Sequence, residues 1–262
     1  MRLLILLCSV LIVFAQPLTL IGQDPNQINA QFDQMRLYNR FGNKVFGVKD
    51  PVMDVLRSTT AAPDAAVPKE ARSRFEKGNK LLDKGELQKA VEQFEAAVAA
   101  YPDYASAHNN LGVTALFLGD LDRAEKAFQL AAKLDPQLTS AHINLGLVKI
   151  QRQHFTEAET PLRTANRLDP QNLKTLTLLA YVEALNKEYD DAILAGRRVH
   201  AFPNHKPFAF AHMVTATALQ SAGRTDEAIA EYKLFLQEDP ANPRAPVAQQ
   251  ALQILQGGSP PK

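Results

Sequence analysis

Apolar residues recur through the middle of the chain at intervals of three and four, the spacing that places side chains on one face of an α-helix. In the run from Leu121 to Leu134, Ala124, Phe128 and Ala131 fall at i, i+4 and i+7. Pro136 follows this run and ends it, because proline has no amide hydrogen to donate. Short polar breaks separate one run from the next. The pattern predicts pairs of helices joined by tight turns.

The predicted pairs recur with steps of 34, 34, 34 and 36 residues. Three series of small or helix-ending residues follow this period: Gly78, Gly112, Gly146, Ala180 and Ala216; Ala90, Ala124, Ala158, Ala192 and Ala228; and, with a small slip in the last two, Pro102, Pro136, Pro170, Pro203 and Pro240. A small residue is needed where two helices cross closely. Stacked units of this length form extended binding surfaces rather than catalytic pockets.

The repeats resemble those of tetratricopeptide repeat (TPR) proteins. Repeat two carries the family pattern in six places: His108, Leu111-Gly112, Ala115, Ala124, Phe128 and Pro136. The resemblance covers Ala71 to Pro240 and implies an all-α fold, a right-handed α-solenoid of about five helix–turn–helix repeats. We expect an array over 69–242 with repeats at 71–104, 105–138, 139–172, 173–206 and 209–242. A capping helix at 243–256 and a disordered tail at 257–262 would follow.

The first 15 residues have the parts of a secretory signal peptide. Arg2 gives a positive start, residues 3–14 are mostly apolar, and Ala15 is a small residue at a plausible cleavage point. We therefore expect a secreted or periplasmic protein; the alternative is an uncleaved signal that anchors the chain in the inner membrane. Residues 16–68 would form an N-terminal extension and flexible linker, with a helix or a hairpin at 28–48.

Composition argues against several classes of function. Cys8 is the single cysteine and lies in the signal segment, so the cleaved chain has no disulfide, thiol nucleophile or cysteine metal site. Without Arg2 the chain carries 28 basic and 28 acidic side chains, and no net charge draws it to nucleic acid or to an anionic membrane. No phosphate-binding glycine loop or nucleophile elbow occurs in the sequence. We expect no enzyme activity, no cofactor, no nucleic-acid partner and no membrane insertion after signal cleavage.

Three histidines occupy the same position in three repeats: His108, His142 and His212. Histidine is a common metal ligand. In the family, however, a large packing residue stands here, and no carboxylate or cysteine joins these histidines at ligand spacing along the sequence. We therefore expect packing roles and no metal site.

Repeat four departs from the pattern. Gly196 stands where the family has a large aromatic residue, and two additional residues precede repeat five. We expect a local change of superhelix angle there. The same stretch is the most basic of the chain and supplies a candidate secondary basic patch: Arg197, Arg198, His200, His205 and Lys206. The alternative is an ordinary solvated charge run.

The family resemblance also implies where a partner binds. In TPR proteins the first helix of each repeat lines a concave groove that holds a peptide or helix of a protein partner. The corresponding groove residues are Phe75, Asn79, Leu82, Asn109, Val113, Leu116, Phe117, Ile143, Leu147, Ile150, Tyr181 and Met213. Some of these positions are expected to pack between repeats. The row is nevertheless apolar for a surface, and exposed apolar patches mark partner sites.

One type of TPR groove clamps an acidic peptide terminus with asparagines and basic residues. Asn79 and Asn110 match its asparagine positions, but Phe75, Ser140 and Asn144 stand at the basic ones. Because the neutralising charges are missing, we expect an apolar helix or an extended segment instead. A further hypothesis is that the chain's own apolar segment from Phe32 to Phe46 docks into the groove and competes with partners.

These observations predict a non-enzymatic protein–protein interaction scaffold of the cell envelope. One alternative is an accessory subunit of an envelope enzyme or assembly complex. The other is a glycan-binding module, against which the absence of tryptophan argues, since such modules use exposed aromatic platforms.

Overall fold

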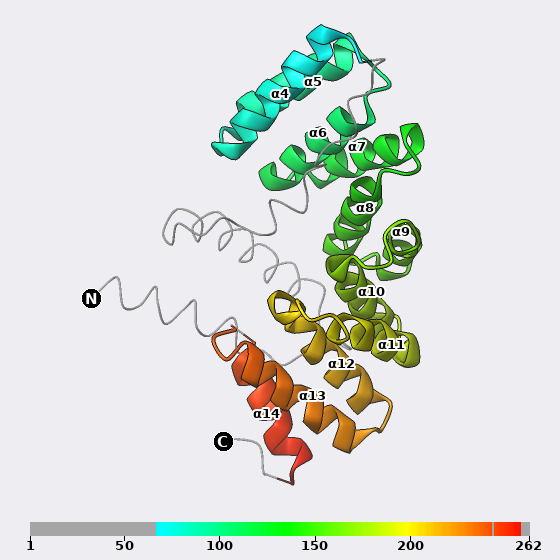
Figure 1. Ribbon diagram of the computed structural model, residues 1–262, viewed down its shortest axis with the longest axis vertical. Helices are drawn as coiled ribbons and strands as arrows, with labels where there is room; N and C mark the ends of the chain where they lie inside the picture. Colours follow the sequence, from blue (N-terminus) through cyan, green and yellow to red (C-terminus); the bar gives the residue numbers. More distant parts are fainter. Residues whose placement is uncertain (1–66, 243, 258–262) are drawn as a thin grey trace, which may run out of the picture. The chain divides into compact units, whose positions relative to one another are not determined.

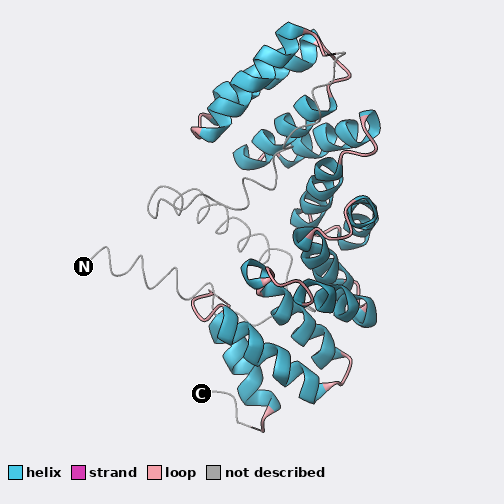
Figure 2. Cartoon of the chain, in the orientation of Figure 1, coloured by secondary structure: helices cyan, strands magenta, loops and turns pink. Residues whose placement is uncertain are grey.

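The computed structural model describes residues 67–242 and 244–257 of the chain. Within these ranges every regular element is a helix and no strand occurs, as Figure 2 shows. The predicted signal peptide, the extension up to residue 66 with its apolar segment, and the tail from residue 258 lie outside the described residues.

The helices form successive antiparallel pairs, one pair to a repeat. Their bounds are α4 Lys69–Asp83 and α5 Leu87–Ala100; α6 Ala105–Leu118 and α7 Leu121–Leu134; α8 Thr139–Gln151 and α9 Phe155–Leu168; α10 Leu173–Leu185 and α11 Tyr189–His200; α12 Phe210–Ser221 and α13 Thr225–Glu238. A final helix, α14 (Ala245–Leu255), follows the last pair. The fold is therefore the expected all-α solenoid type, built from helix–turn–helix repeats.

The described residues divide into two compact units after Pro170. Figure 1 labels the helices of both units. The N-terminal unit holds α4 to α9, and its core joins side chains of the first three repeats, including Leu82, Phe94 and Val148. The C-terminal unit holds α10 to α14. Its last core is closed by α14, which buries Val247 and Ala248 against α12 and α13. The helix predicted after the last repeat thus covers an apolar face that solvent would otherwise reach.

The small residue of the 34-residue period lies where the two helices of a repeat touch. A Cβ atom placed on Gly78 would be 2.6 Å from the ring of Phe94, and one on Gly112 would be 2.7 Å from the ring of Phe128. In repeat three Leu162 approaches Gly146 equally closely. Each glycine is therefore fixed by the large side chain sixteen residues later.

The turn inside each repeat uses one residue in the left-handed conformation. Gly85, Gly119 and Gly223 have φ of 71°, 84° and 76° at this point. Gln153 and Lys187 stand at the same point of repeats three and four, with φ of 63° and 67°. These two side chains occupy backbone that favours glycine, so repeats three and four carry conformational strain in their turns.

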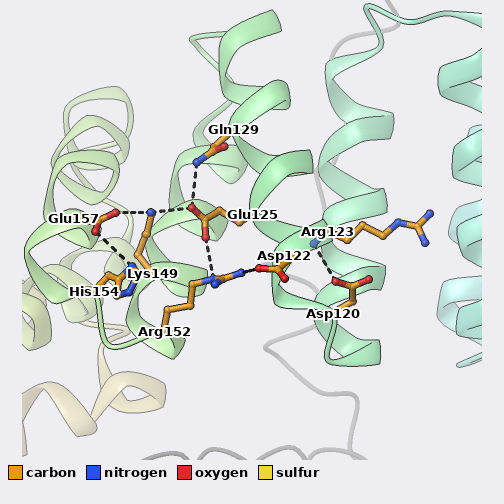
Figure 3. A network of polar contacts seen from close by, with 9 residues as sticks. All are labelled: Asp120, Asp122, Arg123, Glu125, Gln129, Lys149, Arg152, His154 and Glu157. Atoms are coloured by element: carbon orange, nitrogen blue, oxygen red, sulfur yellow. Dashed lines mark hydrogen bonds and ion pairs between the residues drawn. The ribbon is translucent and has the colours of Figure 1, made fainter. Parts of the chain in front are cut away.

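Repeats two and three of the N-terminal unit are joined by an ionic network, drawn in Figure 3. Glu125 of α7 lies at its centre, 2.8 Å from Lys149 Nζ and 2.9 Å from Arg152 Nε. Arg152 also pairs with Asp122, and Lys149 with Glu157. The hydrogen bonds from Lys149 to its two glutamates raise the pKa of its ammonium group. The network ties α7 to α8 and to the start of α9.

Repeat four differs from the others for a steric reason. A Cβ atom on Gly196 of α11 would lie 1.9 Å from the Thr215 hydroxyl of α12, so no aromatic side chain fits there. Thr215 donates its hydroxyl to the carbonyl of Ala211 at 2.8 Å. The two additional residues fall in the connection that contains a short 3-10 helix, η1 (Lys206–Phe208).

Candidate functional site: the face of the first helices

The structure divides the predicted groove residues into two groups. Seven are buried within the chain and do not form an open surface: Leu82, Asn109, Val113, Leu116, Ile143, Ile150 and Met213. Five are half-buried: Phe75, Asn79, Phe117, Leu147 and Tyr181. Seven of the twelve are therefore packing residues of the first helices, and the groove predicted from the sequence was too broad.

For Asn109, Val113 and Leu116 the physical reason is the central position of α6 in the N-terminal unit. This helix contacts α4 and α8 as well as the second helices α5 and α7. All its residues from Ser106 to Leu116 except His108 are buried. Side chains such as Val113 thus fill the space between neighbouring first helices instead of facing a ligand.

Three of the predicted groove residues of the N-terminal unit are both apolar and half-buried. Phe75 of α4 packs its ring 5.0 Å from Tyr104 and 5.9 Å from Phe94, measured between ring centroids. Phe117 of α6 and Leu147 of α8 lie against the same core. We call Phe75, Phe117 and Leu147 the first-helix row.

Asparagines form a hydrogen-bonded chain across the three repeats of this unit. Asn144 of α8 donates to Asn109 of α6 at 2.9 Å, Asn109 donates to Asn110 at 3.1 Å, and Asn110 donates to Asn79 of α4 at 2.7 Å. The first three are buried and Asn79 is half-buried. Asn110 therefore donates its amide to a partner within the protein.

In the C-terminal unit the predicted residue Tyr181 belongs to an aromatic and cationic group. Its ring lies 6.1 Å from that of Phe210, over which the Arg244 guanidinium is placed at 4.5 Å. Burial raises the pKa of the Tyr181 phenol and lowers that of Arg244. Met213, the other predicted residue here, is fully buried.

The candidate basic patch is not an exposed cationic surface. Arg197 is paired with Glu227 at 2.5 Å. His200 and His205 are half-buried beside glutamates of α13, and His205 Nε2 lies 2.8 Å from Glu238. Of the five residues, Arg197 and Lys206 are exposed and Arg198 is half-buried. Of the two interpretations left open by the sequence, these carboxylate partners argue against the secondary basic patch.

The three histidines at equivalent repeat positions have different partners. His108 Nε2 lies 2.8 Å from the carbonyl of Pro102, and His142 Nε2 lies 3.0 Å from that of Pro136. His212 instead contacts two carboxylates, Glu231 at 2.6 Å and Glu238 at 3.4 Å. The fold thus brings two carboxylates to His212, although neither stands at ligand spacing from it along the sequence.

This histidine–glutamate group could not be predicted from the sequence because its members come from four segments: α11, the connection after it, α12 and α13. The one available signal was on α13, where Glu231 and Glu238 are seven residues apart and therefore share a helix face.

Among the described helices, none combines the length and the apolar composition that crossing a membrane requires.

Comparison with known proteins agrees with the repeat geometry. The sequence model of the tetratricopeptide repeat family matches residues 75–139 and 143–206. The chain is a tetratricopeptide repeat protein. Comparison with the curated proteins found no match.

Several solved structures share the fold at low sequence identity. A tetratricopeptide repeat protein from Parabacteroides merdae has 18% identity and a TM-score of 0.61, over 72% of this chain and 75% of its own. MamA has 23% identity and a TM-score of 0.58, over 65% of this chain and 92% of its own. YrrB, described as a TPR protein with an unusual peptide-binding site, has 17% identity and a TM-score of 0.60, over 67% of this chain and 90% of its own.

Proposed function

We propose that this protein is a non-enzymatic protein–protein interaction scaffold that binds a segment of a partner along the first helices of its N-terminal unit. The observation that carries the proposal is the first-helix row, in which three of the predicted groove residues, one each from α4, α6 and α8, are apolar and half-buried. Repeat proteins of this class use such extended faces for recognition and are generally not enzymes. The description of YrrB as a protein with a peptide-binding site supports the same type of ligand.

The chemistry of the row favours an apolar segment over a charged one. Phe75, Phe117 and Leu147 offer apolar and aromatic contact area, and the asparagines of the same helices are already bonded to one another. A helix that presents apolar residues on one face, or an extended segment with apolar alternate residues, meets such a row without leaving a charge unpaired.

The compartment in the proposal rests on the first 15 residues alone. A cleaved signal places the scaffold in the periplasm or outside the cell, and an uncleaved one anchors it in the inner membrane. Within that compartment the second candidate function is an accessory subunit of an envelope enzyme or assembly complex. Such a subunit would co-purify with one enzyme at a fixed ratio, whereas a general scaffold would not.

Panning a random-peptide display library on the purified chain without residues 1–15 tests the binding face. Selected peptides should have apolar residues at helical or alternating spacing. Phe117→Lys and Leu147→Lys should each weaken their binding at least tenfold, because a lysine cannot occupy an apolar contact without losing its hydration. Circular dichroism would show that both variants keep the helical content of the wild type.

Leu130→Lys is the matched control. Leu130 is an apolar residue of α7, the second helix of repeat two, and is 38% exposed. Peptide binding should survive this change. If the peptides bind all three variants equally well, the proposed face is wrong.

A further inference from the structure

Three histidines and two glutamates gather in the C-terminal unit where repeat four meets repeat five. They are His200 at the end of α11, His205 before η1, His212 on α12, and Glu231 and Glu238 on α13. Two sets of three ligand atoms lie within 4.8 Å of one another: those of His205, His212 and Glu238, and those of His200, His212 and Glu231.

The hydrogen bonds of His205 and His212 fix which ring nitrogen carries the hydrogen. His205 Nδ1 lies 2.6 Å from the carbonyl oxygen of Phe202, which can only accept, so Nδ1 donates. His212 Nδ1 likewise donates to Glu231 at 2.6 Å. In the neutral imidazole the second nitrogen then has a lone pair. A histidine that binds metal is oriented in this way, by a carbonyl or carboxylate on its other nitrogen.

The two lone pairs point toward one carboxylate. His205 Nε2 is 2.8 Å from Glu238 Oε1, and His212 Nε2 is 3.4 Å from Glu238 Oε2. His212 Nε2 and Glu238 Oε2 are buried without a hydrogen bond, and the His212 side chain is only 3% exposed. Acceptor atoms facing one another at these distances need a positive centre between them, either a proton or a metal ion.

The ring of His200 is stacked on the ring of His212. This stacking argues against a positive charge on both rings at once. Their centroids are 3.5 Å apart with an interplanar angle of 16°, and two charged imidazolium rings would repel at that distance.

We propose that His205, His212 and Glu238 bind a divalent first-row transition-metal ion, best matched by Zn²⁺, with Glu231 and the Phe202 carbonyl orienting the two histidines. Two imidazoles and a carboxylate suit Zn²⁺, whereas Mg²⁺ and Ca²⁺ prefer oxygen ligands throughout. Tetrahedral Zn²⁺ with bonds of about 2.0–2.1 Å sets its ligand atoms about 3.4 Å apart. The observed separations need only small side-chain movements to reach that geometry.

The set through His200 and Glu231 is the weaker candidate. It would use His212 Nδ1, the nitrogen already hydrogen-bonded to Glu231. The chosen set has three protein ligands and leaves a fourth position for water. A metal ion bound by these three residues would link the connection around His205 to α12 and α13. The repeat period lengthens from 34 to 36 residues in this connection.

The test uses the chain without residues 1–15, freed of metal with a chelator and titrated with ZnCl₂ by calorimetry. We expect one Zn²⁺ per chain and a higher midpoint of thermal unfolding in its presence. His205→Gln and Glu238→Gln should each weaken Zn²⁺ binding at least tenfold, and Glu231→Gln should weaken it about 10- to 100-fold. His205 is half-buried in a connection, so its variant is expected to fold without metal.

His142→Gln is the matched control, because His142 holds the same repeat position as His212 but bonds only to the Pro136 carbonyl. Its Zn²⁺ affinity should equal that of the wild type. Co²⁺ substitution should give the intense visible absorption of a four-coordinate ion in the wild type and lose it in His205→Gln. Absence of Zn²⁺ binding, or equal affinity in His205→Gln and the wild type, would overturn the proposal and leave a proton shared between His205 and Glu238.

Discussion

Gly112 of α6 lies directly against the ring of Phe128 in α7, at a separation that leaves no room for a methyl group. A Cβ atom at Gly112 would be 2.7 Å from the ring, well inside van der Waals contact. We expect Gly112→Ala to destabilise the chain by about 1–3 kcal/mol, because the helices or the ring must shift. Chemical denaturation monitored by circular dichroism would measure this loss.

In repeat four, Ala180 stands at the position of Gly112, and Gly196 stands at the position of Phe128. The reverse substitution, from alanine to glycine, can therefore be made there without a large side chain opposite. Ala180→Gly removes no clash and should cost only about 0.5–1 kcal/mol, through backbone entropy. Equal losses at Gly112 and Ala180 would mean that crowding by Phe128 does not decide the choice of glycine.

The buried asparagine chain makes a second prediction. Asn109→Ala removes the acceptor of Asn144 and the donor to Asn110, both inside the N-terminal unit. Two buried amide groups then lose a partner, and we expect a destabilisation of about 1–3 kcal/mol. Asn79→Ala, at the half-buried end of the chain, should cost less because water can replace the lost amide. A larger loss at Asn79 would contradict this account.

The turn of repeat four offers a stabilising substitution. Lys187 has φ of 67° and an exposed side chain. Since a left-handed residue with a Cβ atom is strained, Lys187→Gly should raise the free energy of unfolding by about 0.5–1 kcal/mol. Gly85→Ala is the converse, at a turn where no atom lies within 4 Å of the added Cβ. It should destabilise through the backbone alone, and a neutral result there would remove the basis of the prediction.

The pair of Glu125 and Lys149 should stabilise the packing of repeat two on repeat three. Their side chains are 16% and 14% exposed, so the charges are less screened than those of surface pairs. A double-mutant cycle with Glu125→Ala and Lys149→Ala should give a coupling of about 1 kcal/mol that falls at high salt. The exposed pair of Glu86 and Lys89 is the control and should show no measurable coupling.

The fold could be predicted because its determinants are local and repeated. Helix spacing, a small residue at each crossing and a proline after each second helix act within one repeat of 34 residues. The run from Leu121 to Leu134 predicted α7 with its observed bounds. The sequence shows that repeat four has Gly196 in place of an aromatic residue. The reason for this glycine is its contact with Thr215, which belongs to the next repeat.

The binding face could be predicted only in outline. Val113 and Leu147 occupy the same repeat position, yet Val113 is fully buried and Leu147 is half-buried. Their difference depends on how closely the neighbouring first helices approach, and the period does not encode that distance. The histidine–glutamate group escaped prediction for the same reason, because it forms across the junction where the period changes.

The asparagine chain has a consequence for exchange between molecules. Its bonds from Asn144 through Asn109 and Asn110 to Asn79 require repeats three, two and one to stand in that order. A first repeat donated by a second molecule would supply an identical Asn79 to Asn110. The chain of amides therefore favours one order of the repeats but does not by itself distinguish a first repeat of the same molecule from one donated by a second molecule.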